Sequence, residues 1–121
     1  MRYTYRLLTV QQVARAASMI CALELIRISS PELYGQREVR IGAWLGNSVT
    51  PGKRKDAVKR LNDLKEGRDV EKFLLKKCPW CGAQIGVVVD GNLVGYEESR
   101  TQNGISRVLA FCPDVHCEFH R

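Results

Sequence analysis

Four cysteines in the last third of the chain form two close pairs. Two residues separate Cys78 from Cys81, four separate Cys112 from Cys117, and 30 residues lie between the pairs. Four thiolates satisfy the tetrahedral coordination of Zn2+, and a glycine directly after the first pair gives the backbone freedom that a tight turn around a metal needs. The pattern therefore predicts a zinc ribbon in which all four cysteines bind one Zn2+.

Other chemistries for these residues stay open at this point. Disulfides would need an oxidising compartment, and a redox-active C-x-x-C pair would lie between a strand and a helix. His116 is the alternative to Cys117 as fourth ligand, and iron is the alternative to zinc. We expect Trp80, between the first two ligands, to cover the metal's apolar surroundings, with stacking on a nucleic-acid base as the alternative.

The chain of 121 residues is basic, with a net charge of +6. Between residues 51 and 77, ten basic and five acidic residues give a local charge of +5. Such a segment favours a polyanionic partner, most often nucleic acid, although a solvated helix face is the alternative. The chain shows neither a signal peptide nor a membrane-spanning run, so we expect a cytoplasmic protein that does not enter a membrane.

The elements ahead of the cysteines alternate between strand and helix patterns. Residues 2–8 and 38–45 alternate like half-buried strands, and a long helix is expected from Thr9 to Ile28. A second helix is expected from Pro51 to Glu66, with Thr50 as its N-cap and Gly67 as its stop. The order strand, helix, strand, helix indicates an incomplete parallel α/β unit, so we expect either a piece of a larger protein or a small protein that docks onto one.

The cysteine-rich part has a different pattern. Strands are expected over residues 85–89, 93–96 and 105–111, joined by turns at Asp90-Gly91 and Asn103-Gly104. These strands would form a three-stranded antiparallel meander between the two cysteine pairs. The expected fold class is α+β, with a partial α/β segment over residues 1–70 and a zinc-ribbon module over residues 71–121.

Several stretches resemble, in order, the helicase protein of bacterial DISARM anti-phage systems. They are Tyr5–Thr9, Ile20–Glu24, Ile41–Gly46, Thr50-Pro51 and Cys78–Gly82. The run from Arg6 to Gln12 also resembles the motif Ia region of superfamily 2 helicases. The resemblance implies that the first segment is a partial RecA-like unit, that the zinc ribbon is an insertion in it, and that the parent protein is an ATP-dependent DNA translocase.

The resemblance also implies a nucleic-acid site. Arg6, Thr9 and Gln11 match the strand-contacting motif Ia, and Thr50 begins a stretch that resembles motif Ib, whose helix N-terminus would suit a phosphate. The candidate site adds the basic residues Lys53, Arg54, Lys59 and Arg60. Plain helix capping by Thr50 and a surface position for Arg6 stay as alternative interpretations.

The functional expectation is a zinc-binding fragment of a helicase-like protein that contacts nucleic acid, with DNA as the expected form. The chain has no G-x-x-x-x-G-K-[ST] loop and no Asp-Glu box, so we expect no ATP hydrolysis by this chain alone. Its partners would be DNA and the rest of a larger helicase chain or a partner subunit. The alternative is a zinc ribbon that binds another polypeptide and has no catalytic activity.

Overall fold

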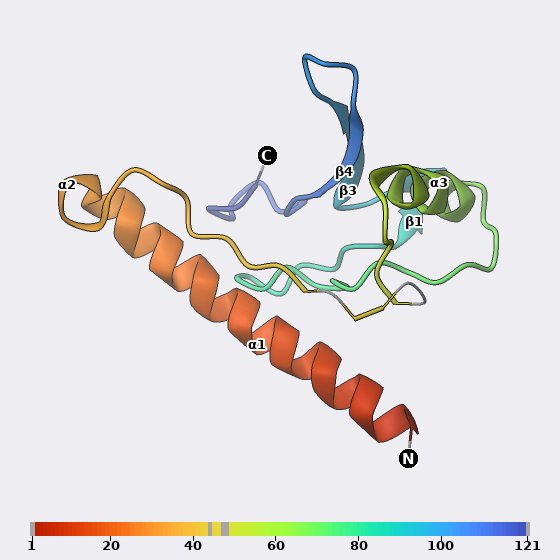
Figure 1. Cartoon of the computed structure of the whole chain (residues 1–121), viewed down its shortest axis with the longest axis horizontal. Coiled ribbons are helices and arrows are strands. Elements are labelled where there is room, and N and C mark those ends of the chain that lie inside the picture. The colour runs from red at the N-terminus through yellow and green to blue at the C-terminus, as the bar shows by residue number, and fades with distance from the viewer. Residues whose placement is uncertain (1, 44, 47–48, 121) are drawn as a thin grey trace. The chain divides into compact units, whose positions relative to one another are not determined.

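The computed structural model describes residues 2–43, 45–46 and 49–120 (Figure 1). The helices are α1 (Arg2–Ser29), α2 (Pro31–Tyr34) and α3 (Arg54–Lys65), and the strands are β1 (Val88–Val89), β2 (Asn92–Leu93), β3 (Tyr96–Arg100) and β4 (Ser106–Ala110). The chain divides into two compact units, which we call unit 1 (Met1–Ala43) and unit 2 (Trp44–Arg121). This division differs from the boundary expected at residue 70, because α3 belongs to the same unit as the four cysteines.

α1 is one uninterrupted helix of 28 residues. The strand predicted over residues 2–8 is wrong, because these residues form the first turns of this helix. No glycine or proline interrupts the sequence between Arg2 and Ser29, and a seven-residue alternation is a weaker determinant than continuation of a long helix. α1 ends just ahead of Pro31, which disfavours helical geometry in the residue before it. Among the described residues, no helix combines the length and the apolar composition needed to cross a bilayer.

A polar cluster on α1 organises the rest of unit 1. Arg27 donates from Nε and Nη2 to the two carboxylate oxygens of Glu24, at 2.9 and 2.6 Å. The backbone N–H of Val39 donates to the same carboxylate at 3.0 Å, and Arg27 donates to the carbonyl of Gly35 at 3.2 Å. The strand predicted over residues 38–45 is therefore wrong in its described part. The Glu24 carboxylate accepts the Val39 N–H that a neighbouring strand would otherwise have accepted.

α3 begins later than the sequence pattern indicates. Its N-cap is Lys53, so the capping role predicted for Thr50 is wrong. The Thr50 hydroxyl instead accepts from the N–H of Leu45 and donates to the carbonyl of Gly46, both at 3.2 Å, which closes a local turn. The predicted stop is confirmed, since the helix ends before Gly67, whose φ is 75°. Within the described ranges, residues ahead of the cysteines form helices and irregular segments, not the predicted strand, helix, strand, helix order.

Unit 2 contains two antiparallel hairpins where a three-stranded meander was predicted. β1 and β2 pair across Asp90-Gly91, and the positive φ values of these residues, 49° and 76°, fit the predicted two-residue turn. β3 and β4 pair over five residues each and are joined by the loop that contains Gly104. The predicted strand over residues 93–96 is split because Gly95, at a φ of 80°, separates β2 from β3.

A small apolar core joins α3 to the hairpins. Its buried members are Leu61, Leu64, Ile85, Leu93 and Tyr96, and Val70, Phe73, Leu75 and Val108 pack around them. Tyr96 stacks on Phe73 with ring centroids 4.6 Å apart and donates its hydroxyl to the carbonyl of Leu75 at 2.7 Å. Burial raises the pKa of Tyr96 well above its ordinary value. This core is distinct from the cluster of buried cysteines, against which Ala83 and Phe119 pack.

Candidate metal centre

The first cysteine pair lies in a tight turn. The N–H of Cys78 donates to the carbonyl of Ala83 at 2.8 Å, and the N–H of Gly82 donates to the carbonyl of Cys78 at 3.0 Å. Gly82 has a φ of 79°, which residues with a side chain rarely adopt. The glycine noted in the sequence therefore allows the turn that brings Cys81 beside Cys78.

The second pair lies in a longer turn closed by both backbone and side chain. The N–H of Cys112 donates to the carbonyl of Phe119 at 3.2 Å, and the N–H of Cys117 donates to the carbonyl of Asp114 at 3.1 Å. The Asp114 carboxylate accepts from the N–H of His116 at 2.9 Å. These bonds leave His116 exposed while Cys112 and Cys117 are buried.

The two turns bring the four sulfur atoms to within 4.8 Å of one another. Cys78 Sγ lies 4.0 Å from Cys117 Sγ, and Cys81 Sγ lies 3.4 Å from Cys112 Sγ, so each close contact joins one turn to the other. Four Zn–S bonds of about 2.3 Å in a tetrahedron give S–S distances of about 3.8 Å, which lies within the observed range. The arrangement fits a tetrahedral metal ion, and Cys117 supplies the fourth sulfur of the cluster.

Backbone N–H groups donate to the sulfurs of this cluster. Burial alone would raise the pKa of Cys78, but amide bonds from Cys81 and Trp80 and contacts with neighbouring thiols bring it below its ordinary value. For Cys112 and Cys117, burial outweighs one amide bond each and raises the pKa. Buried thiolates need a compensating positive charge, which a divalent cation at the centre of the cluster would supply.

An aromatic pair connects the two turns on the outside of the cluster. Trp80 donates its indole N–H to the carboxylate of Glu118 at 2.9 Å, and its ring meets Phe119 edge-on with centroids 6.1 Å apart. Phe119 and Ala83 also pack against the buried cysteines. These contacts support the expected covering role of Trp80, although 41% of this residue's surface is exposed.

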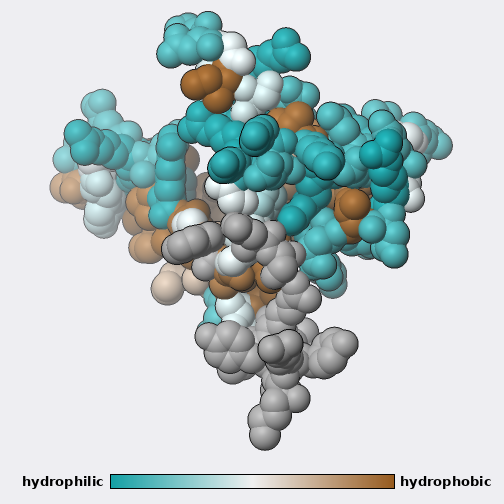
Figure 2. All heavy atoms as spheres, turned by 45° about the vertical axis from the view of Figure 1, so that its right-hand side comes forward, coloured by the Kyte–Doolittle hydropathy of each residue, from teal (hydrophilic) through white to brown (hydrophobic). Residues whose placement is uncertain are grey.

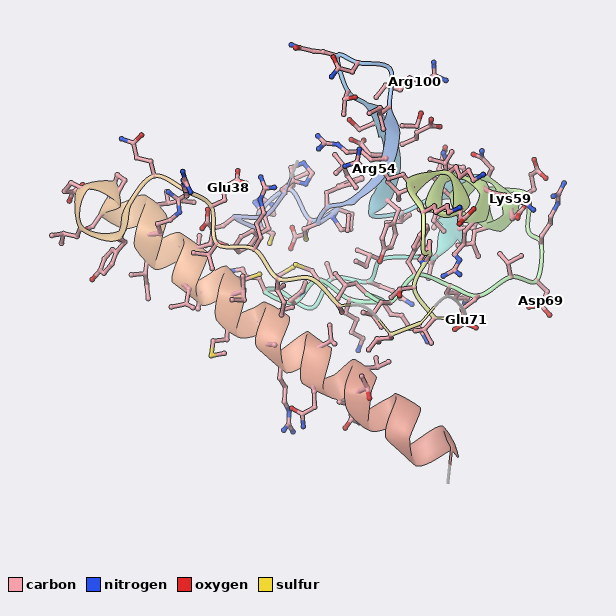
Figure 3. The ribbon with its side chains drawn as sticks, viewed as in Figure 1. Glu38, Arg54, Lys59, Asp69, Glu71 and Arg100 are labelled. Atoms are coloured by element: carbon pink, nitrogen blue, oxygen red, sulfur yellow. The ribbon has the colours of Figure 1, made fainter. Side chains whose placement is uncertain are left out.

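α3 and its N-cap residue carry a second group of charged side chains, which we call the basic face: Lys53, Arg54, Lys55 and Lys59. All four are exposed, and none takes part in an ion pair within the described part of the chain. Lys55 and Lys59 are four residues apart on the side of α3 opposite its buried leucines. Figure 3 shows Arg54 at the start of the helix and Lys59 further along it, and hydrophilic residues dominate the surface of unit 2 that Figure 2 brings forward.

Two predicted nucleic-acid residues near α3 have other contacts. Arg60 is half-buried and donates from Nη1 to the carbonyl of Val49 at 2.9 Å, which ties the preceding loop to the helix. The hydroxyl of Thr50 is used in the turn described above. Lys55 was not among the predicted residues, although its helical spacing from Lys59 was visible in the sequence.

The remaining predicted residues, Arg6, Thr9 and Gln11, lie in unit 1. All three are in the first half of α1 rather than at the end of a strand. Gln11 is exposed and Thr9 is half-buried, and the side chain of Arg6 lies outside the described part. Their helical setting differs from the strand and turn in which we expected them to contact a DNA backbone.

The comparisons with known proteins point to one system. No protein-family model matches the chain. The whole chain is similar to a segment of the DISARM protein DrmA of Bacillus paralicheniformis, with 32% identity over 127 aligned positions. The chain spans 11% of the length of that curated relative. It is thus homologous to a part of a larger DISARM protein and carries a four-cysteine cluster able to hold a metal ion.

Proposed function

We propose that this chain is a zinc-binding, DNA-contacting segment of a larger DISARM-type helicase-like protein. The observation that carries the proposal is the similarity to DrmA along the whole chain, together with four sulfurs at distances suited to one ion. Lys53, Arg54, Lys55 and Lys59 would supply the contacts to DNA. Strand translocation would belong to the larger protein, and this segment would position DNA or a neighbouring part of that protein.

Zn2+ would be held by Cys78, Cys81, Cys112 and Cys117. An ion with four protein ligands has no open position for water or substrate, so its role would be structural. The ion would join the two cysteine turns by bonds that the small core of unit 2 cannot replace. This assigns the metal to folding and leaves catalysis to other parts of the parent protein.

The basic face would bind phosphates without reading sequence. Lysine ammonium groups act as point charges toward phosphate oxygens, which fix position on a duplex and carry little sequence information. Lys55 and Lys59 repel each other on an isolated helix by a few tenths of a kcal/mol, and a bound phosphate would remove that repulsion. We therefore assign DNA contact to this face.

Charge reversal on the basic face tests DNA contact. Four phosphate contacts on duplex DNA predict a slope of log affinity against log salt of about −4, because each contributes about −0.9. The double variant Lys55→Glu/Lys59→Glu should reduce the slope by about 2 and weaken binding equally on unrelated sequences. Fluorescence anisotropy with short duplexes from low to moderate salt measures both quantities, and a wild-type slope near zero would exclude phosphate contact.

A matched control separates site contact from net charge. Arg37→Glu/Arg40→Glu makes the same charge change at exposed positions of unit 1 and should alter the slope much less. Arg60 is left intact because its loss would release the loop at Val49. If both double variants weaken DNA binding equally, the basic face has no special role, and the alternative of a protein-binding ribbon gains support.

A further inference from the structure

The C-terminal half of α1 presents large apolar side chains to solvent along one line. Met19, Leu23 and Ile26 are 61%, 45% and 49% exposed. Their spacing of four and then three residues places them on one side of the helix, and Arg15 continues the same line one turn earlier. We call Arg15, Met19, Leu23 and Ile26 the α1 seam. Isolated exposed apolar residues are ordinary, but three in helical register form a continuous surface.

The shape of the α1 seam fits another helix. Met19 and Ile26 are seven residues apart with Leu23 between them, which is close to the repeat by which two helices pack along a shared stripe. α1 contains no glycine or proline that would kink it, so the line of side chains is not interrupted. An amphipathic helix with apolar residues at three- and four-residue spacing would therefore cover the seam.

Charge argues against a second copy of α1 as that helix. α1 contains four arginines and one glutamate, and this glutamate, Glu24, is already bonded to Arg27 and Val39 within unit 1. Two copies packed along their seams would bring together net charges of +3 with no free acid to offset them. Arg15 is exposed and has no ion pair among the described residues, so an acidic residue on the covering helix would complement it.

The small area of the α1 seam indicates where the covering helix comes from. Stable complexes between separate proteins bury about 800 Å² on each partner, more than three half-exposed side chains supply. A helix in the same polypeptide acts at an effective concentration in about the millimolar range and needs less area. We propose that the α1 seam is covered by an acidic-flanked amphipathic helix from another part of the same DrmA-like polypeptide. This rests on the proposed function, which places the chain within a larger DISARM protein.

Hydroxyl-radical footprinting tests the proposal. The probe is the Bacillus paralicheniformis DrmA protein with its matching segment replaced by these 121 residues, compared with the 121-residue chain alone. Met19, Leu23 and Ile26 should be severalfold less reactive in the chimera, and Met19→Glu should lower the chimera's melting temperature more than Ala14→Glu, an exposed position off the seam. Equal reactivity of the seam in the two proteins would overturn the proposal.

Measurements on the chain alone keep the proposal testable if the chimera does not fold. The chain should sediment as a monomer at all concentrations. Met19→Glu should lower its melting temperature by no more than Ala14→Glu does. A larger loss of melting temperature in Met19→Glu, or dimers that this substitution dissociates, would show that the seam is already covered in the isolated chain. Either result would overturn the proposal. DNA binding is read on unit 2 with the Lys55 and Lys59 variants, so loss of DNA contact and loss of docking are distinguishable.

Discussion

The four cysteines differ in their surroundings although they share one cluster. Cys78, Cys112 and Cys117 are buried, whereas Cys81 is exposed. His116, the neighbour of the last cysteine, is exposed, and its backbone N–H donates to the Asp114 carboxylate at 2.9 Å. We therefore propose Cys117, and not His116, as the metal ligand at this end of the cluster.

Exchange of the last ligand tests this assignment. Cys117→Ser should weaken zinc binding by more than the roughly 10- to 100-fold that loss of an outer partner costs, because a direct metal–sulfur bond is lost. His116→Ala should leave the affinity unchanged. Competition with a chromogenic chelator measures both. If His116→Ala released the metal and Cys117→Ser did not, the assignment of ligands would be reversed.

Glu24 makes a pH-dependent contribution to the stability of unit 1. Side-chain hydrogen bonds from Arg27, and then the amide of Val39, lower the pKa of Glu24 to about 2 from an ordinary 4.5. Because the folded pKa is the lower one, the stabilisation is complete above about pH 4.5 and is lost as the pH falls from there toward 2. Hydrogen exchange of the Val39 amide should lose protection over that range, and in Glu24→Ala, which removes the acceptor, the protection should be low and independent of pH. Protection in wild type that does not change between pH 6 and 2.5 would contradict this.

For helices, strands and turns, patterns of a few neighbouring residues predicted the structure better than the alternation of polar and apolar residues did. The cysteine turns, the Asp90-Gly91 hairpin and the stop at Gly67 depend on a few neighbouring residues, and the structure contains all of them. The two predicted strands ahead of the cysteines depend on partners that alternation alone cannot identify. One became the start of α1, and the described part of the other is held by Glu24 instead of a strand.

Gly95 shows why the hairpins could not be placed from sequence alone. At its φ of 80°, an added Cβ would collide with the side chain of Ile85 and lie 3.1 Å from the carbonyl of Phe111. Gly95→Ala should destabilise unit 2 by about 2–4 kcal/mol, since it combines overpacking with backbone strain. Gly104→Ala has a similar φ but open space, and should cost only about 1 kcal/mol. Urea unfolding compares the two, and equal losses would mean that the contact with Ile85 does not constrain the hairpins.

At the scale of the whole molecule, the two units are stabilised in different ways. In the part of unit 2 that the structure describes, five buried residues form an apolar core, and a separate cluster surrounds the cysteines. In the described part of unit 1, Ala17 is the one buried apolar residue, so its long helix lacks a core of its own. The proposed metal ion would contribute to the folding of unit 2, and the proposed covering helix would contribute to the stability of unit 1.

X-ray absorption at the zinc edge, on protein purified without chelators and checked for stoichiometry by native mass spectrometry, tests the central claim most directly. One zinc ion per chain with four sulfur neighbours at about 2.3 Å is the predicted result. Protein without bound metal, or a zinc ion with nitrogen or oxygen in place of one or more sulfurs, would contradict the account.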